Sequence, residues 1–164
     1  MKSKQSILLA SGSPRRKELL LQLAVKFTVK AADIDETIID DESPRDYVMR
    51  LSREKALAGF VQCDGQKPSL GSDTIVLLDN EILGKPVTRE EAVMMLTRLS
   101  GRRHHVYSAV ALALDENRIQ DRLNVTAVTF GKMPADWIKR YCQGKEPMDK
   151  AGAYAVQGAT GQDI

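Results

Sequence analysis

The fold is decided by residues 7–16, which read Ile7-Leu8-Leu9-Ala10-Ser11-Gly12-Ser13-Pro14-Arg15-Arg16. The apolar residues at the start of this stretch predict a short buried strand. The turn that follows ends in Ser13-Pro14, the order typical of a helix N-cap and a first helical residue. The predicted helix carries an apolar stripe formed by Leu19, Leu20 and Leu23. The chain therefore opens with a strand, a tight turn and a helix.

Two further helices have clear start signals. Ser43, Pro44 and Asp46 form a capping signature at the beginning of a long amphipathic helix. One face of that helix is formed by Tyr47, Val48, Leu51, Lys55 and Ala58. Thr88 and Glu91 form a capping box for the next helix, whose apolar residues repeat at helical spacing as far as Ser100-Gly101. Residues 134–141 predict one more short helix.

Strand patterns lie between these helices. Residues 27–29 predict a second short strand, and residues 70–74 lead into an apolar strand at 75–78. The turn Asp79-Asn80 reverses the chain towards residues 81–83, which predicts a hairpin. Long strands are predicted at 106–114 and 118–130, joined by a turn. Because antiparallel hairpins argue against a purely parallel sheet, we predict an α/β fold with α-β-α layers around a mixed, twisted central sheet.

Composition excludes several classes of protein. The chain has 164 residues, 43% hydrophobic and 28% charged, which is ordinary for one globular domain. Its net charge of +2 gives no general surface for a nucleic acid polymer. The apolar run near the N-terminus is too short for a signal peptide or a membrane span. Only two cysteines are present, without metal-ligand spacing. We therefore expect a cytoplasmic protein with neither membrane nor nucleic acid partners.

An anion site is predicted at residues 11–16. Ser11, Ser13, Arg15 and Arg16 place hydroxyl and guanidinium groups beside the backbone N–H groups of a helix N-terminus. The helix dipole favours phosphate there, and arginine adds bidentate charge-assisted bonds that suit a polyphosphate. The alternative is an ordinary Ser-Pro cap with two solvated arginines.

Several carboxylates and lysines are candidates for chemistry. The cluster Asp33-Ile34-Asp35-Glu36 has oxygen ligands for a divalent cation, or forms a solvated acidic loop. Asp73 stands at the mouth of an apolar strand, where it can bind metal or accept a proton, or simply cap the strand. Lys55 either faces a cleft or only buries its aliphatic stem. Lys85, in Gly84-Lys85-Pro86, either meets phosphate oxygens or is an exposed turn lysine.

Three ring-bearing residues are given no function. His104 and His105 open a predicted strand without a neighbouring nucleophile or a third metal ligand. Trp137 lies on the short helix at 134–141, where it is expected to belong to the core rather than to a stacking platform.

A series of short motifs resembles the Maf family. In order, these are residues 9–16 (Leu-Ala-Ser-Gly-Ser-Pro-Arg-Arg), 35–36 (Asp-Glu), 53–56 (Arg-Glu-Lys-Ala), 71–74 (Gly-Ser-Asp-Thr), 84–86 (Gly-Lys-Pro), 99–101 (Leu-Ser-Gly) and 149–154 (Asp-Lys-Ala-Gly-Ala-Tyr). Any one of them can arise by chance, but this order and spacing are specific. The resemblance implies a dimeric α/β protein, related in fold to inosine triphosphate pyrophosphatases, that hydrolyses nucleoside triphosphates between the α and β phosphates.

The resemblance also implies roles for individual residues. Asp73 is the expected proton acceptor, and Glu36 is expected to hold a Mg²⁺ or Mn²⁺ ion with it. Lys55 and Lys85 are expected to act with Asp73 in catalysis by neutralising the polyphosphate. The expected substrate-binding residues are Ser11, Ser13, Arg15, Arg16, Thr74 and Gln157. Arg15, Thr74 and Gln157 resemble the subgroup acting on dTTP and UTP rather than the 7-methyl-GTP subgroup, so we predict a dTTP/UTP pyrophosphatase with Gln157 reading the base edge.

The family usually continues beyond the Gln-Gly motif through a strand pair and a closing helix. We therefore expect residues 1–164 to form a single Maf-like domain that lacks these C-terminal strands and helix. Two other functions remain open. One is a non-catalytic nucleotide-binding or septum-formation regulatory protein, and the other is a phosphatase that releases orthophosphate.

Overall fold

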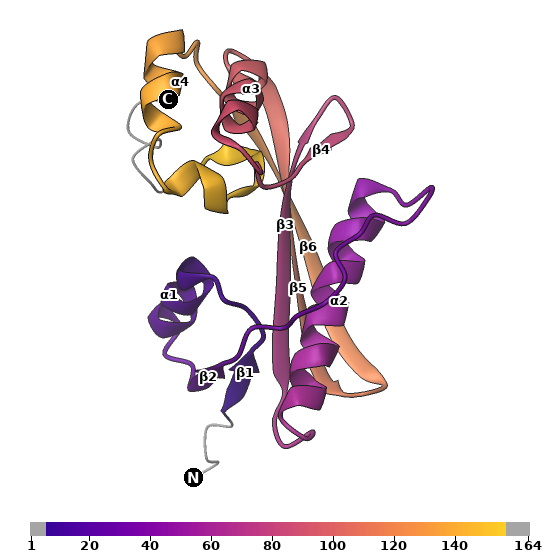
Figure 1. Cartoon of the computed structure of the whole chain (residues 1–164). Helices are drawn as coiled ribbons and strands as arrows, with labels where there is room; N and C mark the ends of the chain where they lie inside the picture. Colours follow the sequence, from indigo (N-terminus) through magenta and orange to yellow (C-terminus); the bar gives the residue numbers. More distant parts are fainter. Residues whose placement is uncertain (1–5, 157–164) are drawn as a thin grey trace. The chain divides into compact units, whose positions relative to one another are not determined.

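The computed structural model describes residues 6–156 (Figure 1). Its helices and strands are interleaved along the chain, as the sequence predicts. In chain order they are β1 (Ile7–Leu9), α1 (Pro14–Gln22), β2 (Phe27–Val29), α2 (Pro44–Gln62), β3 (Ser69–Leu78), β4 (Glu81–Leu83), α3 (Arg89–Leu99), β5 (Arg103–Asp115), β6 (Arg118–Thr129) and α4 (Ala135–Tyr141), followed by the 3₁₀ turns η1 (Glu146–Asp149) and η2 (Ala151–Ala153).

The strands form one mixed sheet. Its order is β2-β1-β3-β5-β6, and β4 pairs with β3 off this path. β1 pairs in parallel with both β2 and β3, whereas β4 is antiparallel to β3. The two-residue connection between β5 and β6 reverses the chain, which only antiparallel neighbours allow. The predicted α/β fold with a mixed sheet is confirmed.

Local signals explain most of the element boundaries. The side chain of Thr88 accepts a hydrogen bond from the Glu91 N–H, so the predicted capping box starts α3. Asp79 and Asn80 have φ values of 51° and 64°, as a primed hairpin turn between β3 and β4 requires. The Ser43 side chain caps α2 by accepting from the Asp46 N–H. These three predictions are therefore confirmed.

The strand containing Asp73 is longer than predicted. The sequence predicts the strand at residues 75–78, with Asp73 at its mouth as a possible cap. In the structure β3 begins at Ser69, so Asp73 lies in the middle of a strand. Glycine is favourable at position 71 because α2 packs closely over it, and this packing outweighs its weak strand propensity.

The predicted apolar stripe of α1 is wrong in part. Leu20 is buried, but Leu19 and Leu23 expose 43% and 70% of their surface. The helical spacing of the three leucines predicted one buried face, but among the described residues no element packs over all three of them.

Two compact units make up the described residues, and β3, β5 and β6 each run from one into the other. The first contains the chain up to Asp73 together with Ser108–Asn124. There α2 packs on the sheet, and its residues Ala56 and Phe60 form a small core with Ala111 and Ala113 of β5.

The second unit contains Thr74–Tyr107 and the chain from Val125 onwards. In this unit α3 and α4 pack together (Figure 1). Its core is larger, and its fully buried members include Leu78, Leu96, Leu99 and Ala153. Within residues 6–156 no helix has both the length and the apolarity needed to cross a membrane.

Candidate active site

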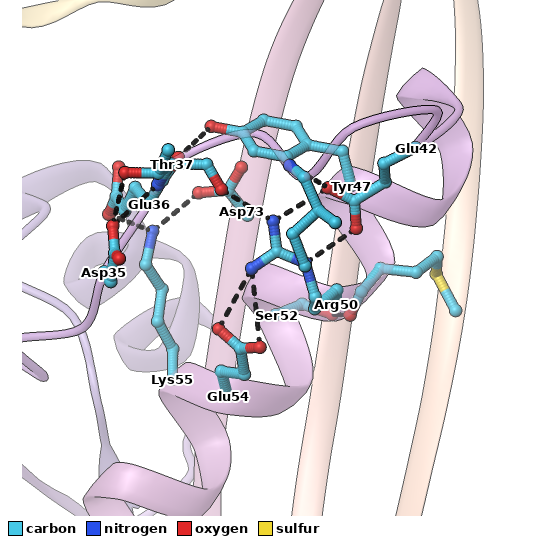
Figure 2. A network of polar contacts seen from close by, with 12 residues as sticks. Asp35, Glu36, Thr37, Glu42, Tyr47, Arg50, Ser52, Glu54, Lys55 and Asp73 are labelled. Atoms are coloured by element: carbon cyan, nitrogen blue, oxygen red, sulfur yellow. Dashed lines mark hydrogen bonds and ion pairs between the residues drawn. The ribbon is translucent and has the colours of Figure 1, made fainter.

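The first unit brings a lysine and two carboxylates to one point (Figure 2). Lys55, on α2, places its Nζ 2.6 Å from Oδ1 of Asp73 on β3 and 2.7 Å from Oε1 of Glu36. Glu36 lies in the segment between β2 and α2. Sequence analysis nominated all three residues, and the structure places the Lys55 ammonium in direct contact with both carboxylates.

Burial sets the electrostatics of this cluster. The side chains of Lys55 and Asp73 are only 11% and 12% exposed, whereas that of Glu36 is 56% exposed. Burial raises the pKa of Asp73, and the charges of Lys55 and Arg16 partly offset this effect. A carboxylate with a raised pKa is a stronger base than an ordinary aspartate, which favours proton transfer.

Gly71, which has no side chain, allows α2 and β3 to lie close together. A Cβ atom on Gly71 would lie 2.3 Å from the backbone N of Ala56 and from the carbonyl O of Ser52. Both atoms belong to the turn of α2 that carries Lys55. Because backbone atoms cannot yield as side-chain ends do, only glycine permits this approach.

Arg16 extends the positive charge beside the carboxylates. Its Nη1 donates to Oγ of Ser11 at 3.0 Å, and the same oxygen accepts the N–H of Ser13 at 3.2 Å. Burial lowers the pKa of Arg16, whereas the nearby charges of Asp73 and Glu36 raise it. Ser13 is the N-cap residue of α1, but its hydroxyl makes no capping bond.

Arg15 contacts different groups from its neighbour. Its Nη1 lies 3.2 Å from Oε2 of Glu18, and both side chains are exposed. Residues one apart on a helix point about 100° away from each other, which explains the difference. The structure therefore brings Arg16, but not Arg15, into the electrostatic surroundings of Asp73 and Glu36.

The remaining predicted site residues belong to the second unit or fall outside the described residues. Thr74 and Lys85 belong to the second unit, where both are exposed. Gln157 lies outside the described residues. Of the unassigned residues, His104 is buried and its Nε2 lies 2.7 Å from the hydroxyl O of Tyr154. Trp137 packs against the core of the second unit, as predicted.

The sequence analysis missed two polar residues near Glu36. Glu42 and Arg50 were given no role there, although Figure 2 shows them in one network with Tyr47. Tyr47 was predicted only as part of a helix face. The spacing of Arg50 and Glu54, four residues apart, would have suggested only a surface ion pair.

Glu36 and Asp73 carry the kind of oxygen ligands that a divalent cation takes. Among residues 6–156 no group of three or more His, Cys, Asp or Glu side chains is arranged to hold a metal ion. However, Glu36 and Asp73 converge on a single positive atom, the Nζ of Lys55. Mg²⁺ is typically held by one or two protein carboxylates, with water and substrate phosphates completing its shell. Glu36 and Asp73 match that donor set.

Comparison with known proteins identifies the family. Residues 6–164 match the family described as Maf-like protein. The chain belongs to the Maf family. This Maf chain is 51% identical over 156 residues to the dTTP/UTP pyrophosphatase of Escherichia coli (strain K12), and the match covers 95% of this chain and 79% of that protein. It is 46% identical over 164 residues to the dTTP/UTP pyrophosphatase of Vibrio parahaemolyticus, covering 100% of this chain and 86% of that protein.

Solved structures support the fold. A HAM1 protein from Coxiella burnetii has a TM-score of 0.55 and 18% identity, covering 79% of this Maf chain and 75% of its own. The Staphylococcus aureus Ham1 protein has a TM-score of 0.55 and 14% identity, covering 96% and 90%. The predicted fold class, which included this neighbouring group, is confirmed.

Proposed function

We propose that this Maf protein hydrolyses dTTP and UTP to the nucleoside monophosphate and pyrophosphate. The observation that carries the proposal is the buried Asp73 carboxylate, held by Lys55 beside Glu36 and Arg16. The activity printed for its Escherichia coli relative, at 51% identity, agrees with the pyrimidine subgroup predicted from Arg15, Thr74 and Gln157.

In the proposed reaction Asp73 accepts a proton from the attacking water. A water oxygen forms a bond to the α-phosphorus while the bond from that phosphorus to the bridging oxygen breaks. The water proton goes to Asp73, and pyrophosphate leaves with the bonding electrons. Lys55 and Arg16 neutralise phosphate oxygens as charge moves onto the leaving group, which is the main task in phosphoryl transfer. Lys85 is proposed to add a further positive charge.

The remaining site residues are proposed to bind the substrate. Ser11 and Ser13 would donate hydrogen bonds to phosphate oxygens near the α1 N-terminus. The Ser11 oxygen accepts from Arg16, so its hydroxyl hydrogen can be donated to the substrate. Arg15, Thr74 and Gln157 would select the nucleotide. We also propose that both units form a single domain, and that the protein is a cytoplasmic homodimer. Size measurement of the purified chain tests the dimer.

We propose Mg²⁺ or Mn²⁺ as the cofactor. When bound, the ion would supply positive charge to the phosphate oxygens, with Glu36 and Asp73 holding it. Activity of protein stripped with a chelator should return on adding Mg²⁺ or Mn²⁺. A nucleotide-independent check is Mn²⁺ binding by paramagnetic resonance, which should weaken in Glu36→Gln.

The decisive experiment is a nucleotide panel with identification of the released ion. Pyrophosphate release from dTTP and UTP above all other triphosphates is the expected result. Orthophosphate release would indicate a phosphatase instead. Absence of turnover with every triphosphate, with both metals supplied, would leave a non-catalytic nucleotide-binding protein as the better description.

A further inference from the structure

Two polar side chains of α2, Tyr47 and Arg50, bind the segment that carries Glu36, and we call this pair the clamp. We propose that Tyr47 and Arg50 are positioning residues, which fix the loop of residues 36–42 so that the Glu36 carboxylate meets Lys55 and Asp73. The consequence for turnover rests on the proposed function, whereas the effect on the loop does not.

Tyr47 fixes the backbone of residue 36 itself. Its hydroxyl donates to the carbonyl O of Glu36 at 2.9 Å (Figure 2). Because the bond is to the main chain, it sets the position of the peptide without using the carboxylate. The Glu36 side chain therefore stays free to contact Lys55 at 2.7 Å.

Arg50 ties the two ends of the loop to the same helix. Its Nη2 donates to the carbonyl O of Thr37 at 3.0 Å, one residue beyond Glu36. The same guanidinium binds Glu42 in a bidentate manner, with Nε to Oε1 at 2.6 Å and Nη2 to Oε2 at 2.8 Å. Its Nη1 lies 3.3 Å from Oε2 of Glu54. One planar side chain thus holds the start and the end of the loop.

Glu42 is the carboxylate that Arg50 binds at the end of the loop. Its side chain is only 9% exposed, although its neighbours in the loop are exposed. The hydrogen bonds from Arg50 lower the pKa of Glu42, so the carboxylate stays ionised. Such a fork-to-fork pair fixes direction as well as distance, which a lysine at position 50 would not do.

The loop has few buried apolar contacts to order it. Residues 35–41 are exposed, and Ile38 and Ile39 show 51% and 55% of their surface. Asp35 accepts from the N–H and hydroxyl of Thr37, two residues further along the loop. A segment with few buried apolar contacts must derive its order from specific polar bonds. Tyr47 and Arg50 supply the bonds from α2 to the backbone of this loop and to Glu42, whereas Lys55, also on α2, binds the Glu36 side chain.

Hydrogen exchange and kinetics test the clamp in the full chain. The variants are Tyr47→Phe, Arg50→Lys and Arg50→Met. Arg53→Met is the matched control, because Arg53 lies on the same helix but pairs with Asp121 of β6. In nucleotide-free protein we expect amides of residues 36–42 to exchange at least about tenfold faster in Arg50→Met and unchanged in the control. Unchanged loop exchange in both Arg50→Met and Tyr47→Phe would overturn the proposal, whether or not the protein turns over dTTP.

A double-variant comparison tests whether the clamp acts through Glu36. Arg50→Met should lower kcat on dTTP about tenfold with a smaller change in KM, and Arg50→Lys should restore only part of it. In a Glu36→Gln background the same Arg50→Met change should cost less than about twofold, because the group it positions is gone. Equal losses in both backgrounds would show that Arg50 acts on general stability instead. If no variant or parent turns over any nucleotide, the proposed function fails and loop exchange alone decides the clamp.

Discussion

The Nζ of Lys55 lies 2.6 Å from Oδ1 of Asp73, and both side chains are almost completely buried. A buried carboxylate without a partner is costly, so the lysine makes the charged form of Asp73 tolerable at this position. The pair therefore has a structural role as well as the proposed chemical one, and the two roles can be separated.

Lys55→Met should destabilise the protein by about 3–5 kcal/mol, because it leaves a buried charge unpaired. The double variant Lys55→Met/Asp73→Asn should recover much of this loss, since asparagine carries no charge to bury. Urea unfolding of the two single variants and the double variant measures the coupling. Purely additive losses would mean that the two side chains do not depend on each other.

Asp73→Asn should separate binding from hydrolysis. If Asp73 accepts the water proton, its amide replacement should cut hydrolysis of dTTP by about 10²-fold or more. Binding of dTTP should be retained, because Lys55 and Arg16 keep their positive charges. Calorimetric titration and a pyrophosphate assay on the same preparation give both values. A variant that hydrolyses at the parent rate would rule Asp73 out as the base.

Arg15 and Arg16 should differ in what their loss changes. Arg16→Ala should depress kcat/KM on all triphosphates alike, by roughly ten- to two-hundredfold, the value of a charge-assisted phosphate bond. Arg15→Ala should instead alter the ratio of pyrimidine to purine turnover, with a smaller loss on the best substrate. The nucleotide panel on both variants is the measurement. Equal and uniform losses from both substitutions would show that this division of roles is wrong.

His104 should make stability fall as the pH drops below about 6.5. Burial lowers the pKa of His104, so the unfolded chain binds a proton at a higher pH than the folded one. Stability should therefore fall as the pH drops through the ordinary histidine pKa of about 6.5, by up to about 1.4 kcal/mol per pH unit. His104→Gln should flatten this slope in denaturant unfolding, and His105→Gln should keep it. A slope that persists in His104→Gln would assign it to other groups.

The sequence predicted local structure better than it predicted contacts. Capping at Thr88 and the Asp79-Asn80 turn depend on neighbours in the chain, so their residue types are sufficient to predict them. The family prediction is confirmed because it used the order of many motifs together. The start of β3 was misplaced because its Gly71 is explained only by the close approach of α2.

At the candidate site, too, the sequence predicted local features but not the contacts between residues distant in the chain. Helical spacing placed Lys55 on the same face as Leu51, but its two carboxylate partners come from a loop and a strand distant in sequence. Arg50 was missed because a charged residue at helical spacing has the pattern of a solvated surface pair. The roles assigned to the site residues remain predictions until the variants are measured.

Gly71 affects how mutational data on this protein should be interpreted. A saturation screen scored by activity should find position 71 about as intolerant as position 73, although glycine has no functional group. The cause is distance: any side chain at 71 would meet the backbone of α2 and move Lys55 away from Asp73. A position that tolerates no substitution can therefore be one that sets the distance between two elements, and need not carry a reactive group. A screen scored separately for soluble yield and turnover should separate the two positions, because a side chain at 71 displaces Lys55 and lowers both, whereas Asp73→Asn removes the buried charge and lowers turnover alone.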